Sequence, residues 1–338
     1  MIYENSKYRE SISRIAFELP IKEGSFLITG ATGLIGSCMI DVFAWANQNL
    51  NCCFRIYALG RSGEKLNKRF AYCKDVVPVV QSIEEPLEIG GVNYILHAAS
   101  NADPRTYAQM PAETILTNVI GARNTLECAK NNHARILLTS TFEVYGKLDQ
   151  DVYAEDDYGL IDENQIRSCY PESKRTSEIL FRAYHDEYGV DSVIARLASI
   201  YGPTMLANDS KAHAQFLRNA INGENIVLKS KGEQKRTYCY VMDAVSGLLK
   251  VLFSGKSCEA YNVANDASIA TIAELASCVA ELAETKVVFD LPDEIESKGF
   301  SKPQNCVLET TKIKALGWQG KFSLKQGLKE TMDILKNG

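Results

Sequence analysis

The segment from Phe26 to Gly36 reads Phe-Leu-Ile-Thr-Gly-Ala-Thr-Gly-Leu-Ile-Gly, and it limits the possible folds more than any other stretch of the chain. A short apolar run precedes three regularly spaced glycines, and a helical pattern of apolar residues follows them. Gly30 permits a tight turn, Gly33 lets the backbone approach a pyrophosphate, and Gly36 lets a helix pack against a strand. A glycine-rich turn without a ligand has the same pattern, so this interpretation depends on the rest of the chain.

The pattern predicts a strand, a turn and a helix whose free N–H groups face phosphates. A dinucleotide such as NAD or NADP is the expected cofactor. The residues expected to bind it here are Gly30, Thr32, Gly33, Leu34, Ile35 and Gly36.

Composition narrows the classes of partner. The chain has 338 residues, a net charge of −5 and no run of lysine or arginine, which argues against nucleic acids and membrane surfaces. Its ten cysteines are scattered without a Cys-x-x-Cys pair, which argues against a zinc site and a disulfide framework and favours a reduced, cytoplasmic compartment. No apolar run is long enough to span a membrane, and the first residues are too polar for a signal peptide.

Apolar runs at residues 54–59, 76–80, 92–99 and 135–139 alternate with helical segments such as 113–130. Repeated strand–helix–strand units predict an α/β fold with a doubly wound, parallel Rossmann sheet. The residues before 24 are predicted to form an amphipathic helix, packed on its own domain or extended as an oligomerisation arm.

The run 54–59 ends in Gly60-Arg61-Ser62, where an NAD-binding fold normally carries an acidic residue on the adenosine ribose. No acid stands there. Arg61 is suited to a ribose 2′-phosphate, which tilts the expectation toward NADP, but a surface arginine at the end of a strand fits equally well.

Three further residues predict hydride-transfer chemistry. Thr141 follows the run 135–139, at the edge of the sheet where ligands bind. Tyr170 and Lys174 are four residues apart in a helical pattern, so their side chains share one face. A lysine charge ~5 Å from the phenol contributes roughly 3 kcal/mol, or about two pKa units, before desolvation is counted. Tyr170 is therefore expected to take a hydroxyl proton while a hydride leaves the adjacent carbon.

The ordered motifs resemble those of the extended short-chain dehydrogenases that modify nucleotide sugars, over about residues 24–335. They are the glycine triple, His97-Ala98-Ala99-Ser100, Asn118, Ser140-Thr141-x-Glu143, Tyr170-x-x-x-Lys174, Tyr201-Gly-Pro203 and Gly232-x-x-x-Arg236. The resemblance implies NAD as cofactor, contacts to it from His97, Ala98, Ala99, Tyr170 and Lys174, a nucleotide-sugar substrate and a homodimer. It also implies that Arg236 binds the substrate pyrophosphate, as suits a guanidinium.

The same resemblance divides the chain in two. Residues 1–198 are predicted to form the dinucleotide-binding domain with its N-terminal extension, and this domain also receives about residues 236–260. Residues 199–338 are predicted to form a smaller, mixed α/β domain that binds mainly the nucleotide sugar.

Within this family the chain most resembles UDP-glucuronate decarboxylases, on the segments Ser100–Tyr107 and Arg167–Arg175. The likeness implies that Tyr107 lies near the sugar carboxylate. Four positions depart from the family pattern. Gly60 and Ser82 stand where many members carry an aspartate near the adenosine of the cofactor. Ser199 replaces a common asparagine that helps hold the substrate diphosphate, and Lys302 stands where a second diphosphate arginine is expected.

Phe142 separates the reactions of the family. The 4,6-dehydratases read Thr-Asp-Glu where this chain reads Thr141-Phe142-Glu143, and phenylalanine transfers no proton. Decarboxylation needs one acid to reprotonate carbon 5 of the sugar, and Glu143 is the candidate, although a carboxylate that caps a helix start would look the same. Decarboxylation is therefore expected first, 4-epimerisation second and 4,6-dehydration third. An NADPH-dependent carbonyl reductase and a non-enzymatic nucleotide sensor are the alternatives from other classes.

Overall fold

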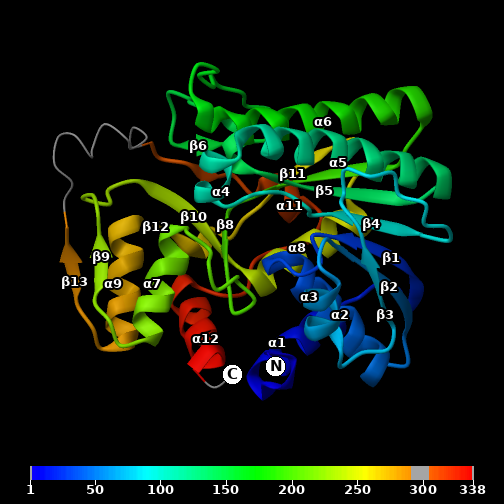
Figure 1. Ribbon diagram of the computed structural model, residues 1–338. Helices are drawn as coiled ribbons and strands as arrows, with labels where there is room; N and C mark the ends of the chain where they lie inside the picture. The colour runs from blue at the N-terminus through cyan, green and yellow to red at the C-terminus, as the bar shows by residue number, and fades with distance from the viewer. Residues whose placement is uncertain (1, 291–303, 337–338) are drawn as a thin grey trace.

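The computed structural model describes residues 2–290 and 304–336 (Figure 1). Its largest sheet has seven parallel strands in the order β11-β7-β5-β4-β1-β2-β3. Their bounds are β1 Glu23–Thr29, β2 Cys53–Gly60, β3 Val76–Val80, β4 Tyr94–His97, β5 Arg135–Thr141, β7 Ser192–Leu197 and β11 Ala260–Val263. The predicted doubly wound Rossmann fold is confirmed. The strand order reverses between β1 and β4, and this reversal opens a crevice at the carboxyl ends of the strands.

Helices cover both faces of this sheet (Figure 1). One face carries α5 (Pro111–Asn132) and α6 (Cys169–Tyr188), and the other carries α2 (Leu34–Asn49) and α8 (Val241–Ser254). Alternating side chains of β1 serve the two faces: Leu27 packs in the core cluster that contains α5 and α6 residues, whereas Phe26 and Ile28 pack with α2 and α8. This burial on both faces explains why the strand sequences are almost continuously apolar.

The N-terminal segment forms a short 3-10 turn, η1 (Ile2–Glu4), and the helix α1 (Ser6–Ala16), which packs on α2 and α8 of the same chain. Asn5 caps α1 by accepting hydrogen bonds from the backbone N–H groups of Lys7 and Tyr8. The Tyr8 hydroxyl donates to the buried Asp41 of α2 at 2.6 Å. The helix predicted before residue 24 is therefore attached to the sheet-bearing part of its own chain.

Small sheets lie beside the carboxyl ends of the large one (Figure 1). Their strands are β8 (Ser199–Tyr201), β10 (Lys235–Tyr240) and β12 (Ile269–Thr271) in one sheet, β9 (Ile226–Leu228) with β13 (Val287–Phe289), and β6 (Val152–Tyr153) with β14 (Val307–Leu308). The helices of this part are α7 (Ala212–Ile221), α9 (Ile272–Ala283), α11 (Thr311–Ala315) and α12 (Leu324–Lys336).

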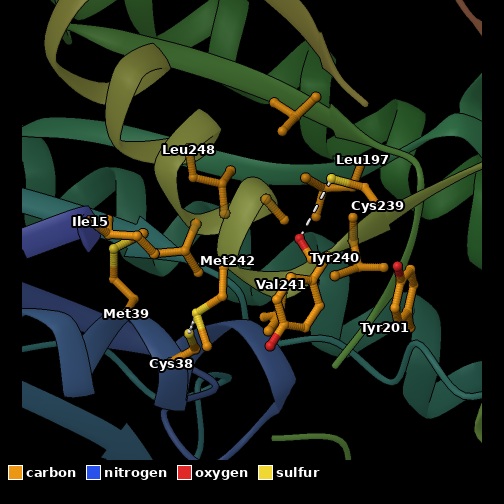
Figure 2. Packing of buried hydrophobic residues seen from close by; sticks show 14 of the residues in the cluster. Ile15, Cys38, Met39, Leu197, Tyr201, Cys239, Tyr240, Val241, Met242 and Leu248 are labelled. Carbon is orange, nitrogen blue, oxygen red and sulfur yellow. Dashed lines mark hydrogen bonds between the residues drawn. The ribbon is translucent and has the colours of Figure 1, made fainter. Parts of the chain in front are cut away.

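One apolar core joins the two parts. Figure 2 shows Cys38 and Met39 of α2 facing Met242 of α8, with Tyr240 of β10 close by. The chain also returns from the small sheets to add α8 and β11 to the large sheet. Because this core is shared, the domain boundary at residue 198/199 stays a prediction.

Candidate active site

A cleft of about 2180 Å³ lies at the carboxyl ends of the large sheet's strands. The β1–α2 turn, the ends of β2, β4 and β5, the start of α6 and the strands β8 and β10 all contribute to its walls. It is lined by these residues predicted from the sequence: Gly30, Thr32, Gly33, Leu34, Ile35, Gly36, Arg61, Ala98, Ala99, Tyr107, Thr141, Glu143, Tyr170, Lys174, Ser199 and Arg236. Lys302 lies outside the described residues.

The β1–α2 turn fits a dinucleotide. Gly30 has a φ of +65°, and a Cβ on it would lie 2.7 Å from the carbonyl oxygen of Ala98. A Cβ on Gly36 would lie 2.5 Å from the carbonyl oxygen of Gly30, so only glycine lets the helix come this close. Gly33 precedes α2, and no side chain caps the helix. The first N–H groups of α2 therefore stay available for phosphate oxygens.

His97 lies behind this turn. Its side chain is buried and does not line the cleft, and its Nδ1 is 3.2 Å from the hydroxyl oxygen of Thr29. That same oxygen accepts hydrogen bonds from the backbone N–H groups of Ala98 and Ala99, both at 3.0 Å. Burial lowers the pKa of His97 to about 3, and the nearby charge of Lys174 adds to the effect. In the structure His97 supports the cleft floor, and its predicted contact with the cofactor stays a prediction.

Tyr170 and Lys174 lie in the first turns of α6, beside the end of β5. Lys174 is buried and donates a hydrogen bond from Nζ to the carbonyl oxygen of Thr139 at 3.0 Å. Burial lowers the pKa of Lys174 to about 8, while the charge of Glu178 acts in the opposite direction. The pair, predicted from its spacing together with the glycine triple and Thr141, therefore faces the cleft from one helix face.

Burial opposes the effect that the lysine charge was expected to have on the pKa of Tyr170. Burial raises the pKa of its phenol well above the usual value, the charge of Glu143 raises it further, and a hydrogen bond with Thr141 lowers it. The arithmetic made from the sequence counted the lysine charge and left desolvation out. The Thr141 hydroxyl oxygen also accepts a hydrogen bond from the backbone N–H of Glu143 at 3.2 Å, so it caps the 3-10 turn η2 (Phe142–Tyr145) as well.

Glu143 forms an ion pair that the sequence did not predict. Its carboxylate lies 2.9 Å from Nη2 of Arg167, which stands in the 3-10 turn η3 (Ile166–Ser168). Arg167 also donates to the hydroxyl of Tyr107 at 3.4 Å. Tyr107, in α4 (Pro104–Gln109), stacks on Tyr170 with ring centroids 5.2 Å apart. The signal for Arg167 was its place three residues before Tyr170, in the turn that precedes α6.

The far end of the cleft carries Arg236 and Ser199. The guanidinium of Arg236 lies 5.1 Å from the ring centroid of Phe142, so Phe142 packs under a cation. Sequence analysis missed Lys211 and His213, which line the same end. Burial lowers the pKa of His213 to about 4. No motif marked the start of α7, where both residues lie, so no sequence signal pointed to them.

Arg61 lies at the rim of the cleft, where its guanidinium pairs with Glu113 of α5 at 3.2 Å. Both side chains are well exposed. A carboxylate beside Arg61 would repel a ribose 2′-phosphate, which weakens the argument for NADP.

Away from the cleft lining, His185, Asp186 and Cys258 form a group of donors close enough together to hold a metal ion. Within residues 2–290 and 304–336, no helix combines the length and apolar character needed to cross a membrane.

The fold and the Tyr170–Lys174 pair define a Rossmann-type protein of the short-chain dehydrogenase class. Residues 26–264 match the model of the NAD dependent epimerase/dehydratase family, and the chain belongs to that family. The predictions of this family and of an NAD-dependent enzyme are confirmed.

Two relatives are similar over most of their length. UDP-glucuronic acid decarboxylase 6 of Arabidopsis thaliana is 36% identical over 329 residues, which cover 96% of this chain and 89% of the relative. UDP-glucuronic acid decarboxylase 1 of Xenopus tropicalis is 31% identical over 312 residues, covering 92% and 72%.

Solved structures share the fold. A UDP-glucose 4-epimerase from Thermotoga maritima superposes with a TM-score of 0.78 at 24% identity, covering 93% of this chain and 99% of that one. A dTDP-glucose 4,6-dehydratase from Streptomyces venezuelae gives 0.79 at 24% identity, covering 93% and 97%.

Proposed function

We propose that this protein is an NAD-dependent UDP-glucuronate decarboxylase. The observation that carries the proposal is the segment Thr141-Phe142-Glu143 at the end of β5. It offers one carboxylate to the cleft, and the neighbouring position, where a 4,6-dehydratase of this family would carry an acid, holds a phenylalanine packed under Arg236. The decarboxylase relatives, similar over 96% of the chain, support the same reaction.

Different residues of the cleft would bind the cofactor and transfer the proton. The β1–α2 turn and the α2 N-terminus would hold the pyrophosphate of NAD, which, when bound, takes up a hydride from carbon 4 of the sugar and later returns it. Tyr170 takes the proton of the carbon-4 hydroxyl, with the Thr141 hydroxyl orienting the phenol. Lys174 would hold the nicotinamide ribose. The charge of Arg167 opposes the burial that raises the pKa of Tyr170, and the charges of Lys174 and of oxidised nicotinamide would add to this effect.

Oxidation at carbon 4 places a ketone β to the sugar carboxylate. The bond between carbons 5 and 6 then breaks, its electron pair passes to the ketone oxygen as an enolate, and carbon dioxide leaves. Glu143 would pass a proton taken up from solvent to carbon 5. When the hydride returns to carbon 4, Tyr170 would give its proton back to the oxygen there. The hydride removed at the start is thereby restored, and the reaction would have no net redox change.

Substrate contacts follow from the same placement. Arg236 and Ser199 would bind the diphosphate, and Tyr107 would lie at the sugar. Lys302 would also bind the diphosphate, as the resemblance implies. Anion binding by a guanidinium supports the role of Arg236.

A product assay tests the reaction. The enzyme, NAD and either UDP-glucuronate or UDP-glucose are incubated, and products are identified by mass and sugar analysis. We expect carbon dioxide and a UDP-pentose from UDP-glucuronate. A product lighter by one water would show dehydration, an isomer of unchanged mass would show 4-epimerisation, and net consumption of NADPH with a carbonyl substrate would show a reductase; each outcome contradicts the decarboxylase proposal.

The proposal extends to assembly and compartment: a homodimer in the cytoplasm. Exposed apolar side chains on the outer helices of the sheet, Ile115 and Leu116 of α5 and Ile179 of α6, support self-association. All ten cysteines are free thiols, which fits a reducing compartment. Sedimentation velocity of the wild type and of Ile179→Lys tests the dimer, and a monomeric wild type would contradict it.

A further inference from the structure

Arg167 is a cation that faces the reacting end of the cleft and belongs to none of the motifs assigned a task. Its side chain is half exposed and lines the cleft beside Tyr170. Nη2 contacts both the Glu143 carboxylate at 2.9 Å and the Tyr107 hydroxyl at 3.4 Å. The guanidinium carbon lies 5.8 Å from the ring centroid of Tyr107, so Arg167 packs against this ring.

The guanidinium has unused donors. A guanidinium offers five N–H groups in a planar fork, and both contacts of Arg167 use Nη2. Within the described part of the chain, its Nε and Nη1 have no hydrogen-bond partner. An arginine held at one nitrogen by an internal carboxylate, with the other nitrogens toward a ligand cleft, can accept a second carboxylate.

We propose that Arg167 receives the carboxylate of the uronate substrate, and that the substrate carboxylate displaces Glu143 from the guanidinium. This inference rests on the proposed decarboxylase function. Glu143 therefore has two states: paired with Arg167 in the protein alone, and released toward the sugar when a uronate is bound.

The exchange solves a problem of decarboxylation. A guanidinium committed to the substrate carboxylate would stabilise the ground state more than the transition state, because the negative charge moves from the carboxylate toward the carbon-4 oxygen as carbon dioxide forms. Glu143 competes for the same guanidinium and so weakens the interaction between Arg167 and the substrate carboxylate. Once neutral carbon dioxide has left and Glu143 has given its proton to carbon 5, Arg167 is free to pair with the Glu143 carboxylate again.

Two other cations of the cleft fit this task less well. The guanidinium of Arg236 lies over the ring of Phe142, and the proposed function assigns it to the diphosphate. Lys174 is buried, and its Nζ is bonded to the carbonyl oxygen of Thr139.

The first test compares a charged sugar with an uncharged one. Binding of UDP-glucuronate and of UDP-xylose to the NAD-loaded enzyme is measured by calorimetry for the wild type and Arg167→Met. Loss of a charge-assisted contact should weaken UDP-glucuronate binding by about 10- to 100-fold and change UDP-xylose binding less than about twofold. Arg167→Lys should restore part of the difference. Arg14→Met, which breaks the Arg14–Glu10 pair on α1, is the matched control and should leave both affinities unchanged.

In the second test, the affinity for UDP-glucuronate should rise instead of fall. Glu143→Gln removes the competing charge, so UDP-glucuronate should bind about two- to fivefold more tightly while its turnover falls. A merely structural role for the ion pair would weaken both ligands in both variants. Equal losses for the two ligands in Arg167→Met, or a loss specific for UDP-glucuronate in Arg236→Met, would overturn the assignment. If the wild type releases carbon dioxide but Arg167→Met keeps its preference, this inference fails and the decarboxylase function stands.

Discussion

The cofactor half of the cleft, around the β1–α2 turn, and the substrate half, around Glu143, are built from different parts of the polypeptide. The cofactor half is made of backbone: Gly30 and Gly36 approach neighbouring carbonyls so closely that a Cβ would collide. The substrate half is made of side chains on distant segments, with Glu143 in η2, Arg167 in η3 and Tyr107 in α4. The first half is therefore locked by sterics, whereas the second can change specificity by exchanging side chains on the same fold.

The largest expected effect comes from Tyr170→Phe, which removes one hydroxyl from the substrate half. Turnover should fall by ~10²–10⁴, the usual contribution of a positioned acid–base group, while NAD binding and the melting temperature change little. Steady-state kinetics measures turnover, a cofactor titration measures NAD binding, and circular dichroism measures the melting temperature. Near-normal turnover at any pH would remove Tyr170 from the mechanism, and loss of NAD binding would show that the two halves are not separable.

A second prediction concerns His97, which lies under the cofactor half. Its pKa of about 3 lies below the usual 6.5, so the unfolded chain binds the proton more tightly than the folded protein does. Stability is therefore lost as the pH falls from about 6.5 toward 3, and His97 alone should account for about 2 kcal/mol by pH 4.5. His213 adds to the same trend, since its pKa is also lowered.

Urea unfolding at pH 7 and pH 4.5 checks this prediction in the wild type and in His97→Gln. The variant should lose less stability on acidification than the wild type. His133→Gln, at the exposed C-terminal end of α5, is the control. An identical acid response of His97→Gln and the wild type would show that His97 takes up its proton without unfolding.

Gly30→Ala tests the steric lock directly. Alanine at a φ of +65° costs about 1–3 kcal/mol, and its Cβ would push against Ala98. Stability and NAD affinity should fall together, the reverse of the pattern expected for Tyr170→Phe. Gly90→Ala is the matched control, because no atom lies within 4 Å of its Cβ and its φ is not in the left-handed region. If Gly30→Ala keeps its NAD affinity, backbone sterics do not determine the cofactor half, and the contrast between the two halves is wrong.

The same contrast explains what could be predicted from the sequence. The glycine triple and the Tyr170–Lys174 pair are local patterns, and the fold that they predict is the one observed. The pKa of Tyr170 depends on desolvation, which appears only when β5, α6 and α4 come together. The Glu143–Arg167 pair joins two 3-10 turns that the sequence pattern does not bring together, and Arg167 was quoted as part of a motif without a task. Backbone-determined sites are therefore visible in a linear sequence, and side-chain networks require the fold.

The smallest effect is expected at Arg61, a side chain on the rim of the backbone-built half. Its exposed guanidinium already pairs with Glu113, so a ribose 2′-phosphate would have to compete with that carboxylate. Arg61→Asp should weaken NADP binding by about five- to tenfold and NAD binding by less than about twofold, since only NADP carries the phosphate. Glu113→Gln should strengthen NADP alone by about two- to fivefold, because it frees the arginine. Fluorescence titrations with both cofactors measure these changes. Equal effects of Arg61→Asp on NAD and NADP would place Arg61 outside the ribose pocket, and cofactor discrimination would then rest on the backbone of the Gly60–Ser62 turn.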